Sequence, residues 1–70
     1  MFAFVAVMDA EQKIVDHIEG LLRSARIRCS SNGNAISELF VERTHVELAI
    51  HLLQAERAAG WPVSVVPVIL

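Results

Sequence analysis

The sequence predicts one α+β domain over residues 1–70, with its elements in the order strand, helix, strand, strand, helix, strand. Three observations support this order. Apolar runs that favour strands stand near both ends of the chain. Two longer stretches repeat apolar residues at helical spacing, and a Ser-Asn-Gly-Asn turn signal separates two strand-like segments between them.

The first element is an apolar run over residues 2–8, rich in aromatic and β-branched side chains, which predicts a buried strand. Asp9 follows and can cap a helix, with Gln12 at the capping-box position. A helix over residues 10–25 is predicted from one apolar stripe, formed by Ile14, Ile18, Leu21, Leu22 and Ala25. Gly20 weakens this helix by about 1 kcal/mol relative to Ala and is a candidate for close packing on the sheet.

The centre of the chain predicts a hairpin. Residues 26–30 alternate polar and apolar side chains, which indicates a half-buried strand, and residues 35–42 form the third strand. Asn and Gly tolerate positive φ, so residues 31–34 are expected to form the turn between them.

The second helix is expected to begin at Thr44, because Glu47 completes a capping box with it. Gly60 is expected to end it. Its core stripe is formed by Val46, Ala49, Ile50 and Leu53. A second apolar row consists of Leu48, Leu52, Ala55 and Ala59, and it is either a minor contact surface or the sign of a deeply seated helix.

Residues 61–70 predict the last strand, and Pro62 and Pro67 place it at a sheet edge because proline cannot donate a ladder hydrogen bond. The complete order is that of a ferredoxin-like fold. In this two-layer sandwich, two helices cover one face of a four-stranded antiparallel sheet. We expect the strand order 4-1-3-2, with the proline-bearing strand at one edge.

Two turns compete for the hairpin. A two-residue Asn32-Gly33 turn pairs Ile27 with Glu38, whereas a three-residue loop over residues 32–34 pairs Ile27 with Leu39. Register follows the hydrophobic pattern, so we favour the second, which also pairs Arg28 with Glu38 and Arg26 with Phe40. The side chains then expected to face the helices are Ala3, Val5, Val7, Ile27, Leu39 and Val41.

The same register turns the aromatic residues toward the face without helices. That face is expected to carry Phe2, Phe4, Ala6, Ile36 and Phe40, rimmed by Arg26, Arg28, Glu38 and Glu42. An apolar patch with a charged rim is typical of an interface. We therefore name Phe2, Phe4, Ile36 and Phe40 as candidate interface residues, with Arg26, Arg28 and Glu38 setting the register. The alternative is that the phase is wrong by one residue and the Phe side chains belong to the core.

Catalytic and metal-binding patterns are not apparent in the sequence. His17, His45 and His51 lack the spacing of a helical metal site and are expected to be exposed or at the border of the core. Cys29 is expected to point inward as a small hydrophobe rather than a nucleophile. Residues 30–34 resemble an anion-binding loop only weakly, so a plain turn is favoured. We expect no enzyme activity and no cofactor.

Composition narrows the functional classes further. The net charge of −2 and the scattered basic residues argue against nucleic-acid binding, although Arg23, Arg26 and Arg28 lie close together. The N-terminal apolar run is too short for a signal peptide or a membrane span, which favours a cytoplasmic protein. A hydrophobic fraction of 54% exceeds what so small a core can hide, which favours a homo-oligomer.

Residues 21–29, 38–42 and 46–53 resemble a small bacterial family of signal-transducing proteins related to PII-like proteins of ferredoxin-like fold. That family has a helix ending in "LLxxxGI" and a later helix carrying "xxAxxLL". This chain departs from it by having Ala25-Arg26 before Ile27, a short hairpin loop and an extra final strand. The resemblance implies a regulatory protein that assembles through its sheet.

The leading expectation is a non-enzymatic protein–protein interaction or regulatory module that acts as a homo-oligomer through its open sheet face. The alternative is a regulatory domain that senses an amino acid or a nucleotide. ACT-type domains share the element order but carry Gly where Met8-Asp9-Ala10 stands here. Such a pocket is expected between subunits, near Asp9 or residues 30–34.

Overall fold

The computed structural model describes residues 1–66 of the chain. Its elements are β1 (Phe2–Asp9), α1 (Gln12–Ser24), β2 (Cys29–Asn32), β3 (Ile36–Glu42), a 3₁₀ turn η1 (Arg43–His45), α2 (Val46–Ala58) and β4 (Val63–Val65). The order of strands and helices is the one that the sequence predicts. The expected strand over residues 61–70 is shorter, and its part from Pro67 onward lies outside the described residues.

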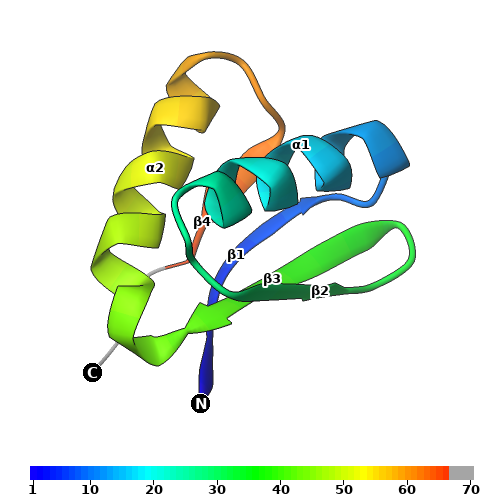
Figure 1. Cartoon of the computed structure of the whole chain (residues 1–70). Coiled ribbons are helices and arrows are strands. Elements are labelled where there is room, and N and C mark those ends of the chain that lie inside the picture. Colours follow the sequence, from blue (N-terminus) through cyan, green and yellow to red (C-terminus); the bar gives the residue numbers. More distant parts are fainter. Residues whose placement is uncertain (67–70) are drawn as a thin grey trace.

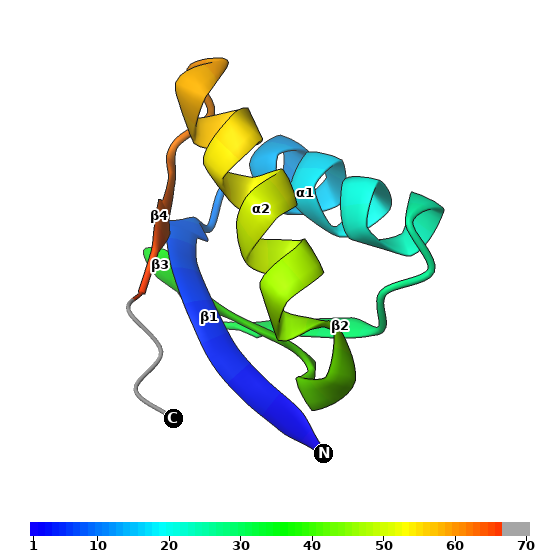
Figure 2. The same cartoon turned by 90° about the vertical axis from the view of Figure 1, so that its left-hand side faces the viewer.

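The strands form one antiparallel sheet in the order β2-β3-β1-β4, which is the expected order 4-1-3-2 counted from the opposite edge. Both helices lie against the same face of this sheet (Figures 1 and 2). The arrangement is α+β and compatible with a ferredoxin-like sandwich. As the prolines predict, β4 is an edge strand, and the Pro62 carbonyl accepts a hydrogen bond from the Asp9 N–H of β1.

A β-bulge in β1 corrects the expected inside–outside pattern of that strand. Phe4 pairs with Phe40, but the next pair is Ala6 with Leu39, so Val5 is the extra residue. Both Val5 and Ala6 are fully buried, and the alternation is inverted from Ala6 onward. The predictions that Ala6 faces outward and Val7 inward are therefore wrong, because an alternating pattern cannot anticipate an inserted residue.

The hairpin register also differs from both turns considered. Ser31 pairs with Leu39 and Asn32 with Glu38, so β2 has moved by four residues relative to the favoured pairing. The predicted partnership of Arg28 with Glu38 is wrong. A shift by an even number of residues leaves every side chain on its face, so the hydrophobic pattern alone cannot detect it.

The physical cause of this shift lies at the end of α1. Arg26 has a φ of 62°, its N–H donates to the Arg23 carbonyl (2.9 Å), and the Ile27 N–H donates to the Leu22 carbonyl (2.9 Å). These two bonds form a Schellman motif, which normally has Gly at the residue with positive φ. Arg26 therefore belongs to the helix end and not to a strand, and β2 begins later.

The end of α2 is built in the same way but with glycine. Gly60 has a φ of 102°, its N–H donates to the Arg57 carbonyl (3.0 Å), and the Trp61 N–H donates to the Glu56 carbonyl (3.0 Å). The sequence correctly predicts Gly60 as the stop. The ends of α1 and α2 are thus equivalent, with Arg26 at one and Gly60 at the other.

The helix starts are less regular than the capping boxes predict. The N-cap of α1 is Glu11, whose N–H donates to the Asp9 carboxylate (2.8 Å), and no side chain caps the helix itself. The segment Arg43–His45 forms the 3₁₀ turn, so α2 begins after Thr44 and without the expected capping hydrogen bond.

The core lies between the sheet and the two helices. It confirms the main stripe of each helix, although Leu21, Ala25 and Ile50 are only half-buried. Of the second row on α2, Leu52 packs against the core while Leu48 remains 46% exposed. The buried apolar side chains are Val5, Ala6, Met8, Ile14, Ile18, Leu22, Ile27, Leu39, Val41, Val46, Ala49, Leu53 and Val63.

Candidate functional site: the open face of the sheet

The face of the sheet opposite the helices carries the three Phe residues. On β3, Leu39 and Val41 are fully buried beneath the helices, so Phe40 between them points to the other side. Its partner across the strands is Phe4, and the two rings lie 5.5 Å apart at an interplanar angle of 40°. The alternative in which the alternation is displaced by one residue and the Phe side chains belong to the core is therefore wrong. We call this surface the open face.

Three more apolar side chains extend the open face from this pair. Phe2 pairs with Glu42 and is 42% exposed, and Ile36 pairs with Asp9 and is 63% exposed. Val7 joins them only because the bulge reverses the phase of β1. The open face therefore consists of Phe2, Phe4, Val7, Ile36 and Phe40, with the exposed Ile36 at one end and Phe2 at the other.

The charged residues stand in other places than the sequence predicts. Glu38 lies across from Asn32. The Arg28 carbonyl accepts the Glu42 N–H at 2.9 Å, which sets Arg28 beside Glu42. Arg26 lies outside the sheet, in the turn after α1.

The surroundings of Glu42 lower its pKa. It accepts a hydrogen bond from the Met1 amino group at 2.9 Å, and this contact, with help from nearby Arg28, holds the pKa of Glu42 below its usual value. Glu42 is therefore a fixed negative charge at the Phe2 end of the open face.

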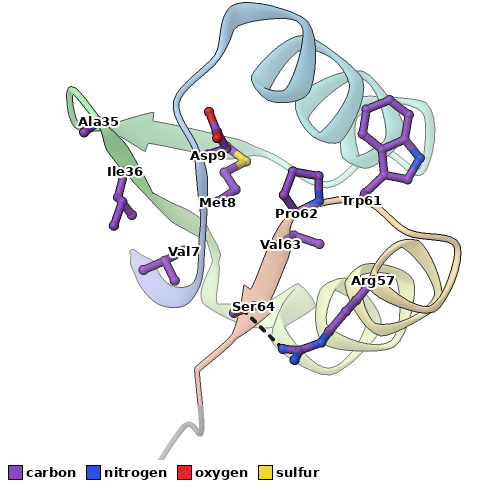
Figure 3. A pocket seen from close by; sticks show the side chains of 10 residues that line it. All are labelled: Val7, Met8, Asp9, Ala35, Ile36, Arg57, Trp61, Pro62, Val63 and Ser64. Atoms are coloured by element: carbon purple, nitrogen blue, oxygen red, sulfur yellow. Dashed lines mark hydrogen bonds between the residues drawn. The ribbon is translucent and has the colours of Figure 1, made fainter.

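A hollow of about 450 Å³ continues the open face at its Ile36 end (Figure 3). Arg57 of α2 closes one side by donating to the Ser64 hydroxyl at 3.2 Å. Asp9, also in the lining, is already engaged by the Glu11 N–H. The lining residues are Val7, Met8, Asp9, Ala35, Ile36, Arg57, Trp61, Pro62, Val63 and Ser64.

His17 belongs to a contact between the helices that the sequence does not reveal. Its ring stacks on Trp61 at 3.6 Å with an interplanar angle of 7°, and its Nε2 lies 2.5 Å from the Glu56 carboxylate. These residues join α1 to the end of α2. His45 and His51 are exposed and take no part in this contact.

Cys29 is half-buried, and its partner Val41 belongs to the helix-covered side of the sheet, as the sequence predicts. Burial, assisted by the neighbouring Glu19 carboxylate, raises the pKa of the thiol above its usual value. The neutral thiol is a weak nucleophile.

Within residues 1–66, no group of three His, Cys, Asp or Glu side chains is close enough to hold a metal ion. Neither helix in this part of the chain is long and apolar enough to cross a membrane. No family model, curated protein or solved structure matches the chain. The part of the chain that the structure describes is a two-layer α+β domain in which neither helix covers the partly aromatic face of the sheet.

Proposed function

We propose that this chain is a non-enzymatic interaction module of ferredoxin-like fold that self-associates through the open face of its sheet. The observation that carries the proposal is the Phe4–Phe40 pair at the centre of a face that no helix covers. Ile36 and Phe2 leave much of their apolar surface in water on either side of it. Burying each of these two side chains contributes about 1–2 kcal/mol, since both are partly exposed.

The occupant that fits this face best is a second copy of the chain. A two-fold axis sets the same patch of each subunit against itself, so a suitable patch must complement its own charges. The open face offers Arg28 beside the end of β3 and Glu38 near its start, and a two-fold axis can bring these opposite charges together.

The size of the molecule fits a modest dimer. The described domain measures 28 × 22 × 20 Å. One such face offers on the order of 400–600 Å² per subunit, which is below the range of stable interfaces and within that of weak, transient ones. We therefore expect a dimer that dissociates at low concentration.

The regulatory part of the proposal rests on the resemblance of residues 21–29, 38–42 and 46–53 to PII-related signal-transducing proteins. A cytoplasmic location fits the single cysteine, Cys29, which has no disulfide partner in the chain.

Sedimentation velocity of the full chain, from micromolar to near-millimolar concentration, tests the proposal. We expect the mass of a dimer at the upper end of that range. Ile36→Glu should give a monomer, because it sets a charge in the interface without touching the core. Leu48→Glu is the matched control, since Leu48 is a similarly exposed aliphatic residue on α2, and it should remain dimeric.

Circular dichroism spectra of both variants establish that each is folded. A wild-type chain that stays monomeric throughout the range contradicts the proposal. Equal masses for Ile36→Glu and Leu48→Glu contradict it as well.

A further inference from the structure

A second hollow, of about 430 Å³, lies at the other end of the domain, where the turn after α1 meets the beginning of β1. It holds three of the six basic residues of a chain whose net charge is −2. Its lining consists of Phe2, Arg23, Arg26, Ile27, Arg28 and Cys29. We call it the arginine pocket. Positive charge is thus concentrated around one aromatic ring.

Two of these arginines are available to a ligand. Arg23 is engaged by Glu19 at 3.3 Å. Among residues 1–66, no carboxylate lies within 4.0 Å of the guanidinium of Arg26 or Arg28, although Glu42 is near Arg28. Arg26 and Arg28 can therefore direct their donors into the arginine pocket.

The electrostatics of the helix end do not account for every basic residue in the arginine pocket. The carboxyl end of a helix favours a nearby cation. At the equivalent end of α2 one such residue, Arg57, stands in the last turn and glycine follows at the position of positive φ. The end of α1 already has Arg23 in its last turn, and Arg26 is an additional cation placed where the backbone favours Gly.

Residues held in unfavourable backbone conformations cluster at functional sites, where the surrounding structure maintains them. Arg26 keeps a left-handed backbone at an exposed turn, and its side chain lines the arginine pocket. Two independent observations therefore concern Arg26. It belongs to a cluster of cations around a hollow, and it is a non-glycine residue in a left-handed conformation.

We propose that the arginine pocket binds a small phosphate-bearing molecule. The planar guanidinium groups of Arg26 and Arg28 match the oxygens of a phosphate, which they can bind in pairs of hydrogen bonds. The Phe2 ring offers an apolar or planar part of the ligand a surface to pack on. A hollow of about 430 Å³ is within the size range of small-molecule sites and fits a ligand of the size of a mononucleotide.

Amide chemical shifts of the full-length chain, recorded at constant ionic strength, provide the test. The probes are AMP, inorganic phosphate and adenosine. AMP is expected to give saturable shifts centred on residues 23–29 and Phe2. Phosphate should shift the same arginine amides more weakly, and adenosine should have the smallest effect because it lacks the anion. Because Phe2 and Arg28 also lie on the proposed dimer surface, the titration is repeated with Ile36→Glu, which is expected to be monomeric and should bind AMP at least as well.

Substitutions separate the arginine pocket from general charge attraction. Arg26→Ala and Arg28→Ala should each weaken AMP binding by about tenfold or more, as loss of a charged hydrogen-bonding partner does. Lys13→Ala is the matched control, because it removes one positive charge at an exposed position on α1 and should leave the affinity unchanged.

Three outcomes contradict the proposal. The first is the absence of saturable shifts with AMP and with phosphate. The second is an equal loss of affinity in Lys13→Ala and Arg26→Ala, which indicates diffuse charge attraction. The third is a set of shifts centred on the hairpin turn at residues 33–35.

Discussion

Replacing Arg26 by glycine should stabilise the domain. A left-handed backbone is less favourable by about 1–2 kcal/mol for an L-residue than for glycine. Glycine also gives the unfolded chain more conformational freedom, which reduces the gain in stability by about 0.5–1 kcal/mol. Arg26 is exposed at its turn, so little packing is lost. The net expectation for Arg26→Gly is a gain of about 0.5–1 kcal/mol in the free energy of unfolding, or about 2–8 °C in Tm for a domain of this size.

Thermal unfolding followed by circular dichroism, at one fixed protein concentration, measures this gain. Arg26→Ala is the control, because it removes the guanidinium but keeps the unfavourable backbone, and its Tm should stay close to that of the wild type. Gly60→Ala gives the reverse experiment. A Cβ at Gly60 meets no atom within 4 Å, so any loss of stability comes from the backbone. The reasoning is refuted if Arg26→Gly melts no higher than Arg26→Ala.

Three further predictions concern single side chains. Gly20→Ala should raise the free energy of unfolding by about 0.8–1 kcal/mol in thermal melts, because a Cβ at Gly20 meets open space, contrary to the close packing suggested by the sequence. Because burial raises the pKa of Cys29, the folded thiol keeps its proton where the unfolded one loses it. The free energy of unfolding should therefore fall as the pH rises above about 9.0. Denaturant titrations at several pH values should show this fall in the wild type and a smaller one in Cys29→Ser. The pKa of Glu42 is lowered in the folded protein, so its effect on stability has the opposite pH dependence. The stabilising contribution of Glu42 is present above its usual pKa of 4.5 and is lost as the pH falls through the folded pKa. Denaturant titrations at acid pH should show this loss in the wild type and a smaller one in Glu42→Gln.

The helices show how much of the fold a sequence pattern predicts. The spacing of Ile14, Ile18 and Leu22 was sufficient to predict the buried side of α1, because a helix repeats regularly and its core face follows from the spacing. The prolines around β4 likewise predict an edge strand, because a residue without an N–H leaves a gap in a sheet ladder.

The strands were less predictable because their faces depend on counting residues without error. One extra residue, Val5, reverses the faces of Ala6 and Val7. Nothing in a run of small and β-branched apolar residues marks where such an insertion falls. The hairpin moved by four residues because Arg26 takes part in the end of α1, and neither outcome violates the hydrophobic pattern.

Of the candidate sites, too, one part is predictable from the sequence and another is not. The sequence predicts that Phe2, Phe4 and Phe40 share the face without helices, and this holds because Phe2 and Phe4 both precede the bulge at Val5, so the alternation that relates them to Phe40 is intact. It did not predict the contact between His17 and Trp61, which are far apart in the chain and meet only when α1 packs beside the end of α2.

The sequence by itself determined the order of the elements, the sides of the helices that are buried and the aromatic character of one sheet face, because these follow from local spacing and turn chemistry. The tertiary structure alone decided which charged side chains border that face and which of them line a common pocket. Strand register is settled by how the whole chain packs, and that packing brings Arg26 and Arg28 around Phe2 in a single pocket.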